Sequence, residues 1–215
     1  MTSFQIASYL ATALLYASLM TMALALVLRI AGRQIGRRGM GRGGLLLTVS
    51  TLFMITLALY PFPDRATFTC VPGAVHTQLQ PFHFLPSFTR LIQTGAPFSA
   101  WVTNLTVSST IMNYLVCMVI GLALAQVTGR WLLAATFAAT LTLGIEFTQL
   151  TGNWGIYPCP YRLFDVDDLI LNFAGVMTGF ALWRGGQAFR EARGQRADAA
   201  GRDRRHRPDP QDRPS

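Results

Sequence analysis

The stretch RLFDVDDLILNFAGVMTG, residues 162–179, carries an Arg, three Asp and an Asn at the edge of, or inside, an apolar run. Small or polar residues recur there at intervals of three or four positions: Asp165, Asp168, Asn172, Gly175 and Gly179. On a helix this spacing places all of them on one face. Small residues four positions apart also allow a second helix to approach closely. We therefore predict that this face contacts protein rather than lipid.

The composition of the whole chain indicates a membrane protein. Of its 215 residues, 51% are hydrophobic and only 13% are charged, against about 25% charged in a typical soluble domain. The net charge of +8 does not indicate a nucleic-acid partner, because most Arg residues flank apolar segments or lie near the C-terminus. We expect the lipid bilayer itself to be the main surroundings of the chain, in a cell membrane that it crosses several times.

Five apolar segments approach or reach the length needed to cross a bilayer, which is roughly 17–25 residues. They extend over residues 4–28, 45–60, 102–125, 131–150 and 169–183. The first is read as a retained helix, because no small-residue cleavage site precedes the Arg cluster. The predicted fold is an all-α, polytopic bundle of about five transmembrane helices. Its predicted parts are a first helix with an Arg-rich loop (1–44), a transmembrane domain (45–185) and a disordered, charged tail (186–215).

The Arg residues are unevenly divided between the two sides that these spans would create. One side holds Arg130 and the clusters at residues 29–42 and after residue 184. The other side holds only Arg65, Arg90 and Arg162. Because Arg is enriched in cytoplasmic loops, we predict that the N-terminus is outside, the C-terminus is inside, and the stretch at 162–179 begins at the outer surface.

The predicted outer side carries a long loop, residues 61–101, with six Pro between Pro61 and Pro97. Loops of this length are usually functional or disordered, but this one is too aromatic for disorder, so we expect it at the bilayer surface. Cys70 lies in it, and Cys159 lies in the next outer loop. Disulfides are permitted on that side. We predict a Cys70–Cys159 disulfide, with two free thiols as the alternative.

A second polar face lies on the segment at 131–150 and just beyond it: Thr142, Glu146, Gln149 and Asn153. A carboxylate inside a membrane span needs a partner or a wet cavity, and Arg162 is the obvious candidate partner for Glu146. Asn113 lies on a third polar face. The sequence thus predicts an outward-facing pocket with Arg162 at its mouth, lined by Glu146, Gln149, Asp165, Asp168, Asn172 and Asn113.

Structural explanations compete with a binding role. Asp165 is a good candidate N-cap, and Asp168 is favoured in a first helical turn by the helix dipole. Glu146 and Arg162 could form a structural ion pair, and Asn172 could bond across helices. Gly121, Gly175 and Gly179 are expected to serve helix packing. His76 and His83 could join the acids around a metal, but their spacing does not require one, so no metal or other cofactor is assigned.

Two motifs carry a family resemblance: GIEFTQL at residues 144–150, and R-x2-D-x2-D-x3-N-x2-G-x3-G from Arg162 to Gly179. They resemble the VanZ-like family of bacterial membrane proteins over residues 45–183. Asn113 and Gly121 fit a weaker element of that family, although Val119 stands where the family favours Pro. QLQPF at residues 78–82 is similar to its short Leu-x-Pro-Phe element.

The resemblance implies a link to resistance against teicoplanin, a lipid-tailed glycopeptide that binds cell-wall precursors. It implies that the polar signature falls on Glu146, Gln149, Arg162, Asp165, Asp168 and Asn172. We predict a site for an amphiphilic cell-envelope ligand: a lipid-linked precursor, a phospholipid or a lipoglycopeptide.

Three other functions stay open at the level of sequence. The first is an integral membrane enzyme that uses Glu146 with Asp165 or Asp168 for acid/base or metal-assisted chemistry on a lipid-linked substrate. The second is a transporter, for which five short spans leave little room unless the chain forms a homodimer. The third is an interaction partner in which the motif serves packing alone.

Overall fold

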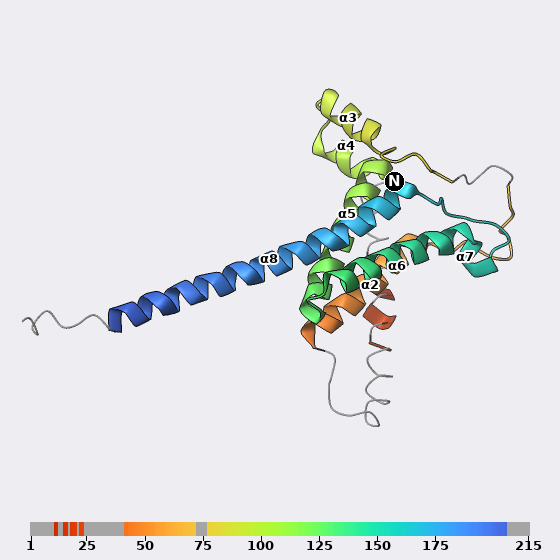
Figure 1. The fold of residues 1–215 in the computed structure, drawn as a ribbon. Helices are drawn as coiled ribbons and strands as arrows, with labels where there is room; N and C mark the ends of the chain where they lie inside the picture. The colour runs from red at the N-terminus through yellow and green to blue at the C-terminus, as the bar shows by residue number, and fades with distance from the viewer. Residues whose placement is uncertain are drawn as a thin grey trace, which may run out of the picture.

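The computed structural model describes residues 11–12, 15–16, 18–20, 22–23, 41–71 and 77–205. The chain is an all-α bundle, as predicted. Four helices of the described part are long and apolar enough to cross a membrane: α2 (Arg42–Leu59), α5 (Leu105–Val127), α6 (Trp131–Leu150) and the Val166–Gln195 portion of α8 (Val166–Arg205) (Figure 1). The segment predicted at 4–28 and the Arg-rich loop lie mostly outside the described residues, and the described positions of that segment are helical.

The centre of the bundle is a close contact between α5 and α8, with α2 and α6 packed around it. Three glycines lie in the contact. A Cβ atom on Gly121 would collide with the carbonyl oxygen of Val176, and one on Gly179 with that of Met118. A Cβ on Gly175 would lie 2.5 Å from the carbonyl oxygen of Tyr114. The absence of side chains at these glycines therefore allows the two backbones to touch.

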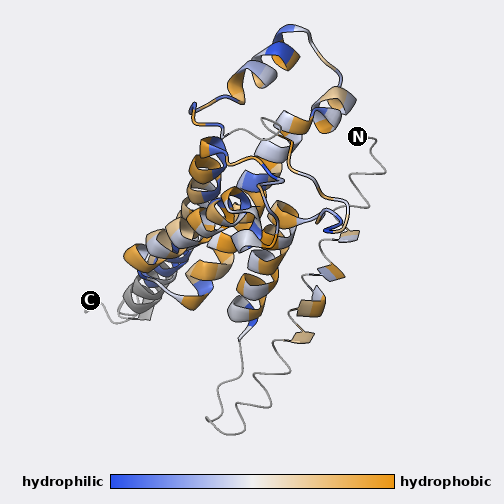
Figure 2. Cartoon of the chain, turned by 90° about the vertical axis from the view of Figure 1, so that its right-hand side faces the viewer, coloured by the Kyte–Doolittle hydropathy of each residue, from blue (hydrophilic) through white to orange (hydrophobic). Residues whose placement is uncertain are grey.

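We call the glycine-lined contact between α5 and α8 the seam. The hydrophobic core lies beside it. Ile120, Val176 and Phe180 are fully buried, and Met54 on α2 and Ala134 on α6 join the same cluster. Much of the length of the long helices is hydrophobic (Figure 2). Large apolar side chains on them are exposed, among them Leu115, Leu132 and Leu182, which suits a bundle surrounded by lipid chains.

The predicted long loop contains two short helices, α3 (Leu85–Gln93) and α4 (Phe98–Thr103). The span that we predicted to begin at residue 102 begins instead at Leu105, because the side chain of Asn104 caps α5 by accepting from the Val107 amide at 3.1 Å. The short helix α7 (Gly152–Gly155) follows α6. We call the end of the bundle formed by residues 60–71, 77–104 and 151–165 the loop end.

Two links hold the long segments of the loop end together. A disulfide joins Cys70 to Cys159, the pair that the sequence analysis named, with 5.9 Å between their Cα atoms. Gln78 forms an isolated parallel bridge with Asp165. In this bridge the Gln78 amide donates to the Phe164 carbonyl at 2.8 Å, and the Val166 amide donates to the Gln78 carbonyl at 3.0 Å. The bridge brings the loop directly to the start of α8.

The C-terminal tail differs from the prediction. We expected disorder over residues 186–215, but α8 continues through its 40 residues to Arg205 and extends well beyond the bundle (Figure 1). Its length is roughly 60 Å at 1.5 Å per residue. The physical reason is composition: the extension is rich in Ala, Arg, Gln and Glu, which favour helix, and it prolongs a helix that is already nucleated. Residues 206–215 lie outside the described part.

Candidate functional site

Glu146 lies near the loop end of α6 and is only 1% exposed. Its Oε2 atom accepts a hydrogen bond from the backbone amide of Asp165 at 2.9 Å. We had considered an ion pair with Arg162, but the hydrogen bond to Glu146 comes from this amide. The second oxygen, Oε1, is buried and has no hydrogen-bond partner among the described residues. An unpaired buried oxygen is unfavourable, so this atom is the most informative one in the site.

Asp165 connects the start of α8 with Glu146 of α6. Its Oδ1 accepts from the Asp167 amide at 2.8 Å, at the start of α8, so its side chain acts as the N-cap considered above. Burial raises the pKa of the Asp165 carboxyl, while that hydrogen bond and the nearby His83 lower it. The capping role accounts for the Asp165 side chain without any ligand, whereas its backbone amide orients Glu146.

Asp168 is linked to α5. Its Oδ1 accepts from the Asn113 side-chain amide at 2.7 Å, a contact between two membrane-crossing helices. Asp168 and Asp165 both lie close enough to act electrostatically on the Glu146 carboxylate, and Arg162 acts on Asp168 in the same way. The fold therefore brings together carboxylates from α6 and from the start of α8, which are 19 or more residues apart in the chain.

Two amides complete the set. Gln149, one turn beyond Glu146 on α6, donates from Nε2 to the Ala58 carbonyl of α2 at 2.9 Å, while its Oε1 has no partner in the described part of the chain. The same holds for Oδ1 of Asn172, which is 3% exposed on α8. We call the following residues the polar cluster: Asn113, Glu146, Gln149, Asp165, Asp168 and Asn172.

Residues next to the polar cluster are anchored to the end of α2. The Asn153 side chain donates to the Tyr161 hydroxyl at 2.9 Å, and this hydroxyl donates to the Leu59 carbonyl at 2.7 Å. Arg162 donates from Nη2 to the Tyr60 carbonyl. Arg162 thus acts electrostatically on Asp168 and also has a structural contact with the end of α2. The sequence analysis did not predict this structural contact.

Sequence reasoning missed the role of Asp167, which it treated only as first-turn charge. Asp167 is 4% exposed. Its carboxylate accepts from the backbone amides of Phe82 and, at 3.2 Å, of Phe84. It therefore fastens the part of the long loop around Phe82 and Phe84, which we call the aromatic loop, to the start of α8. No local signal reveals this contact, because the partners are 83 and 85 residues away.

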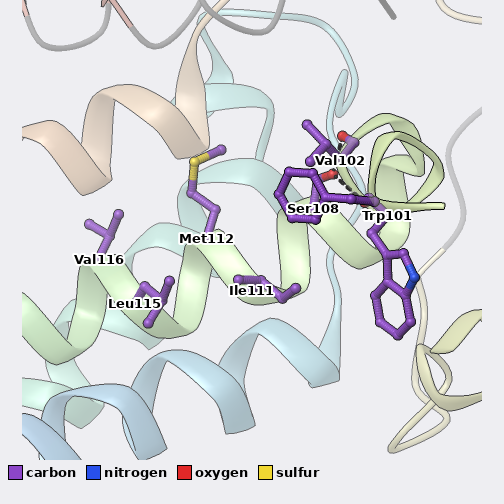
Figure 3. Close-up of a pocket in the computed structure, with 8 residues that line it drawn as sticks. Trp101, Val102, Ser108, Ile111, Met112, Leu115 and Val116 are labelled. Atoms are coloured by element: carbon purple, nitrogen blue, oxygen red, sulfur yellow. Dashed lines mark hydrogen bonds between the residues drawn. The ribbon is translucent and has the colours of Figure 1, made fainter. Parts of the chain in front are cut away.

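An apolar groove of about 800 Å³ lies between α4 and the loop half of α5 (Figure 3). Its lining residues are Phe98, Trp101, Val102, Ser108, Ile111, Met112, Leu115 and Val116. The Ser108 hydroxyl donates to the carbonyls of Trp101 and Val102. Its donor is therefore used within the protein and is not offered to a ligand in the groove. Met112 of the groove and Asn113 of the polar cluster are neighbours in sequence, so the groove and the polar cluster lie at the same level of α5 on different faces of the helix.

No group of three or more His, Cys, Asp and Glu residues in the described ranges is arranged to hold a metal ion. His83 lies near Asp165, and His76 lies outside the described residues. The expectation that the chain binds no metal stays a prediction.

The sequence profile of the family described as VanZ/LLP1 matches residues 47–189. The chain belongs to the VanZ/LLP1 family. The matched region includes the whole polar cluster, Arg162, the three seam glycines and both cysteines of the disulfide. Neither a curated protein nor a solved structure matches the chain. The family and the four apolar helices together make this a VanZ-like membrane protein.

Proposed function

We propose that this VanZ/LLP1 family member binds an amphiphile of the cell envelope, with the polar head at the polar cluster. The observation that carries the proposal is the unpartnered Oε1 of Glu146. A buried carboxylate contributes nothing to apolar packing, and ionisable residues inside membrane spans are expensive unless they serve a function. Asp165 and Asp167 have structural partners that explain them, whereas one oxygen of Glu146 has no partner among the residues that the structure describes.

The groove supports an amphiphile rather than a small polar ligand. It is apolar and lies on α5, the same helix that supplies Asn113. Acyl chains bind to such surfaces through burial of apolar area. A lipid-linked cell-wall precursor, a phospholipid and a lipoglycopeptide all combine a polar head with an apolar tail. The last of these would connect the chain to glycopeptide resistance.

The proposed setting is the cell membrane, with the loop end outside. Two features support this orientation: the predominance of Arg beyond the opposite ends of the helices, and the Cys70–Cys159 disulfide at the loop end. The polar cluster would then meet the outer leaflet, where such amphiphiles are found.

Lipid retention tests the proposal. The chain is extracted in a mild detergent, and the lipids that remain bound are identified by mass spectrometry. We expect a defined set of retained lipids that falls strongly in a Glu146→Gln, Asp168→Asn protein, in which both hydrogen bonds of the wild-type side chains can still form. Glu191→Gln, an exposed change on α8, is the matched control. An identical lipid profile in all three proteins would contradict the proposal.

The free oxygen of Glu146 beside Asp168 also favours one alternative, an integral membrane enzyme in which Glu146 transfers a proton. The distinguishing result is turnover. Incubation of the purified chain with a bacterial lipid extract would produce a lipid of altered covalent structure, and Glu146→Gln would abolish that product. Retained lipids with no such product support binding alone.

A further inference from the structure

We propose that the polar cluster selects head groups that present a primary ammonium. This inference rests on the proposed function and specifies the chemistry of its ligand. It follows from two properties of the polar cluster, namely the kind of atom that is left without a partner and the sign of the surrounding charge.

The unpartnered atoms of the polar cluster are all oxygens: Oε1 of Gln149 and Oδ1 of Asn172, which can only accept, and Oε1 of Glu146, which accepts when the carboxyl is ionised. Their side chains are 5%, 3% and 1% exposed, respectively. The amide of Gln149 cannot simply turn round, because its Nε2 already donates to the Ala58 carbonyl. Acceptors are satisfied only by donors, so a ligand that suits these atoms must donate.

The charge around these atoms is mainly negative. Glu146 is acted on by the carboxylates of Asp165 and Asp168, and Asp167 acts on both of those residues. The opposing positive groups are Arg162, which acts on Asp168, and His83, which acts on Asp165. Charges are weakly screened in an interior of low dielectric constant. A cation is therefore favoured beside Asp165 and Asp168, where it would also hold Glu146 in its ionised form, and a phosphate or carboxylate is disfavoured there.

A primary ammonium meets both requirements, since it combines one positive charge with three N–H donors. A quaternary ammonium has the charge but no donor, and it is usually recognised by aromatic rings. A hydroxyl has a donor but no charge. The described residues hold no cluster of three His, Cys, Asp or Glu side chains around a metal position, which makes an ammonium the better match than a metal ion.

An experiment with three phospholipids tests the proposal, because their head groups differ in net charge and in hydrogen-bond donors. The full chain is reconstituted into nanodiscs that contain equal amounts of phosphatidylethanolamine, phosphatidylcholine and phosphatidylglycerol with identical acyl chains. The lipids that stay bound after release into detergent are then counted by native mass spectrometry. Phosphatidylethanolamine and phosphatidylcholine have the same net charge, but only the first has N–H donors. Phosphatidylglycerol has hydroxyl donors and a net negative charge.

We expect phosphatidylethanolamine to be retained over phosphatidylcholine by roughly tenfold or more, because a hydrogen bond to a charged group is that strong. Glu146→Gln should remove most of the preference, and Glu191→Gln should leave it intact. Asp168→Asn provides a second variant should Glu146→Gln fail to fold, since it keeps the acceptor for Asn113.

Equal retention of phosphatidylethanolamine and phosphatidylcholine would overturn the ammonium proposal while leaving the proposed function standing. Preferential retention of phosphatidylglycerol would likewise overturn it, in favour of an anionic head group. Retention of no lipid by the wild-type chain would count against the proposed function itself.

Discussion

At the scale of single residues, Glu146 and Asp165 depend on each other. The Asp165 amide holds one oxygen of Glu146, while the Asp165 side chain begins α8. A change at Glu146 therefore affects both the candidate site and the packing of α6 against α8. The two effects can be separated, because an amide retains the acceptor and loses the charge.

We predict that Glu146→Leu is less stable than Glu146→Gln by about 1–3 kcal/mol, since leucine leaves the buried Asp165 amide without an acceptor. Glu146→Gln should be at least as stable as wild type, because it removes one of several neighbouring carboxylates. Thermal or chemical unfolding in detergent measures the difference. Equal stability of the Leu and Gln variants would show that the hydrogen bond at 2.9 Å contributes little.

The contact between Asn113 and Asp168 gives a second prediction at this scale. Asn113→Ala removes the donor to a carboxylate and should destabilise the chain by about 1.5–3 kcal/mol. The effect should be smaller in an Asp168→Asn background, where the acceptor is uncharged. Unfolding measurements on the four proteins of this double-mutant cycle give the coupling energy. Ser109→Ala, an exposed change on the same helix, is the control and should have little effect.

At the scale of helices, the seam between α5 and α8 is governed by glycine. The seam glycines allow the backbones to touch, and this approach brings Asn113 and Asp168 within hydrogen-bonding distance. The interval of three or four residues was visible in the sequence, but the partner helix was not. Packing of the seam therefore also positions two members of the polar cluster, Asn113 and Asp168.

Gly179→Ala should separate the two helices, because its Cβ would collide with the Met118 backbone rather than with a mobile side chain. Overpacking of this kind typically costs about 1–3 kcal/mol, and we expect a matching fall in the melting temperature. Gly185→Ala on the same helix meets nothing within 4 Å and should be neutral or mildly stabilising, since Ala favours helix. A similar loss in both variants would contradict a specific seam.

The aromatic loop depends on one carboxylate of α8. Asp167→Ala removes the acceptor for the amides of Phe82 and Phe84, so the loop should detach locally while the bundle stays folded. Hydrogen exchange followed by mass spectrometry should show faster exchange over residues 79–93 and little change in α6. Asp64→Ala, which alters only a local exposed turn, should leave that region protected. Unchanged exchange in Asp167→Ala would argue that the loop is held by its aromatic contacts.

At the scale of the whole molecule, the disulfide tests the orientation. If the loop end is outside the cell, the chain purified under non-reducing conditions should have one reactive thiol, Cys117, after denaturation. A maleimide–polyethylene glycol reagent should then add once without a reductant and three times with one. Three additions without a reductant would place the loop end in a reducing compartment, with the C-terminal helix outside.

The fold could largely be predicted from the sequence, and the site only in part. The span at residues 131–150 coincides with α6, because an apolar run of that length has few alternatives in a membrane. The start of α5 and the helical extension of α8 were predicted incorrectly, since both depend on which residue ends or propagates a helix. Among the polar residues, the fold brings Asn113, Asp165 and Asp168 together with Glu146.

Sequence by itself determined the helical class, the membrane setting and the polar faces, because apolar length and helical periodicity are local properties of the chain. Only the tertiary structure decided that the Asp165 amide donates to Glu146, and that Asp167 holds a loop 85 residues away. It alone also showed that oxygens of Glu146, Gln149 and Asn172 have no donor within the described part of the chain. A hydrogen bond requires its two atoms to be close in space. In these cases the atoms belong to segments that are far apart in the sequence, so the sequence alone does not indicate the contact.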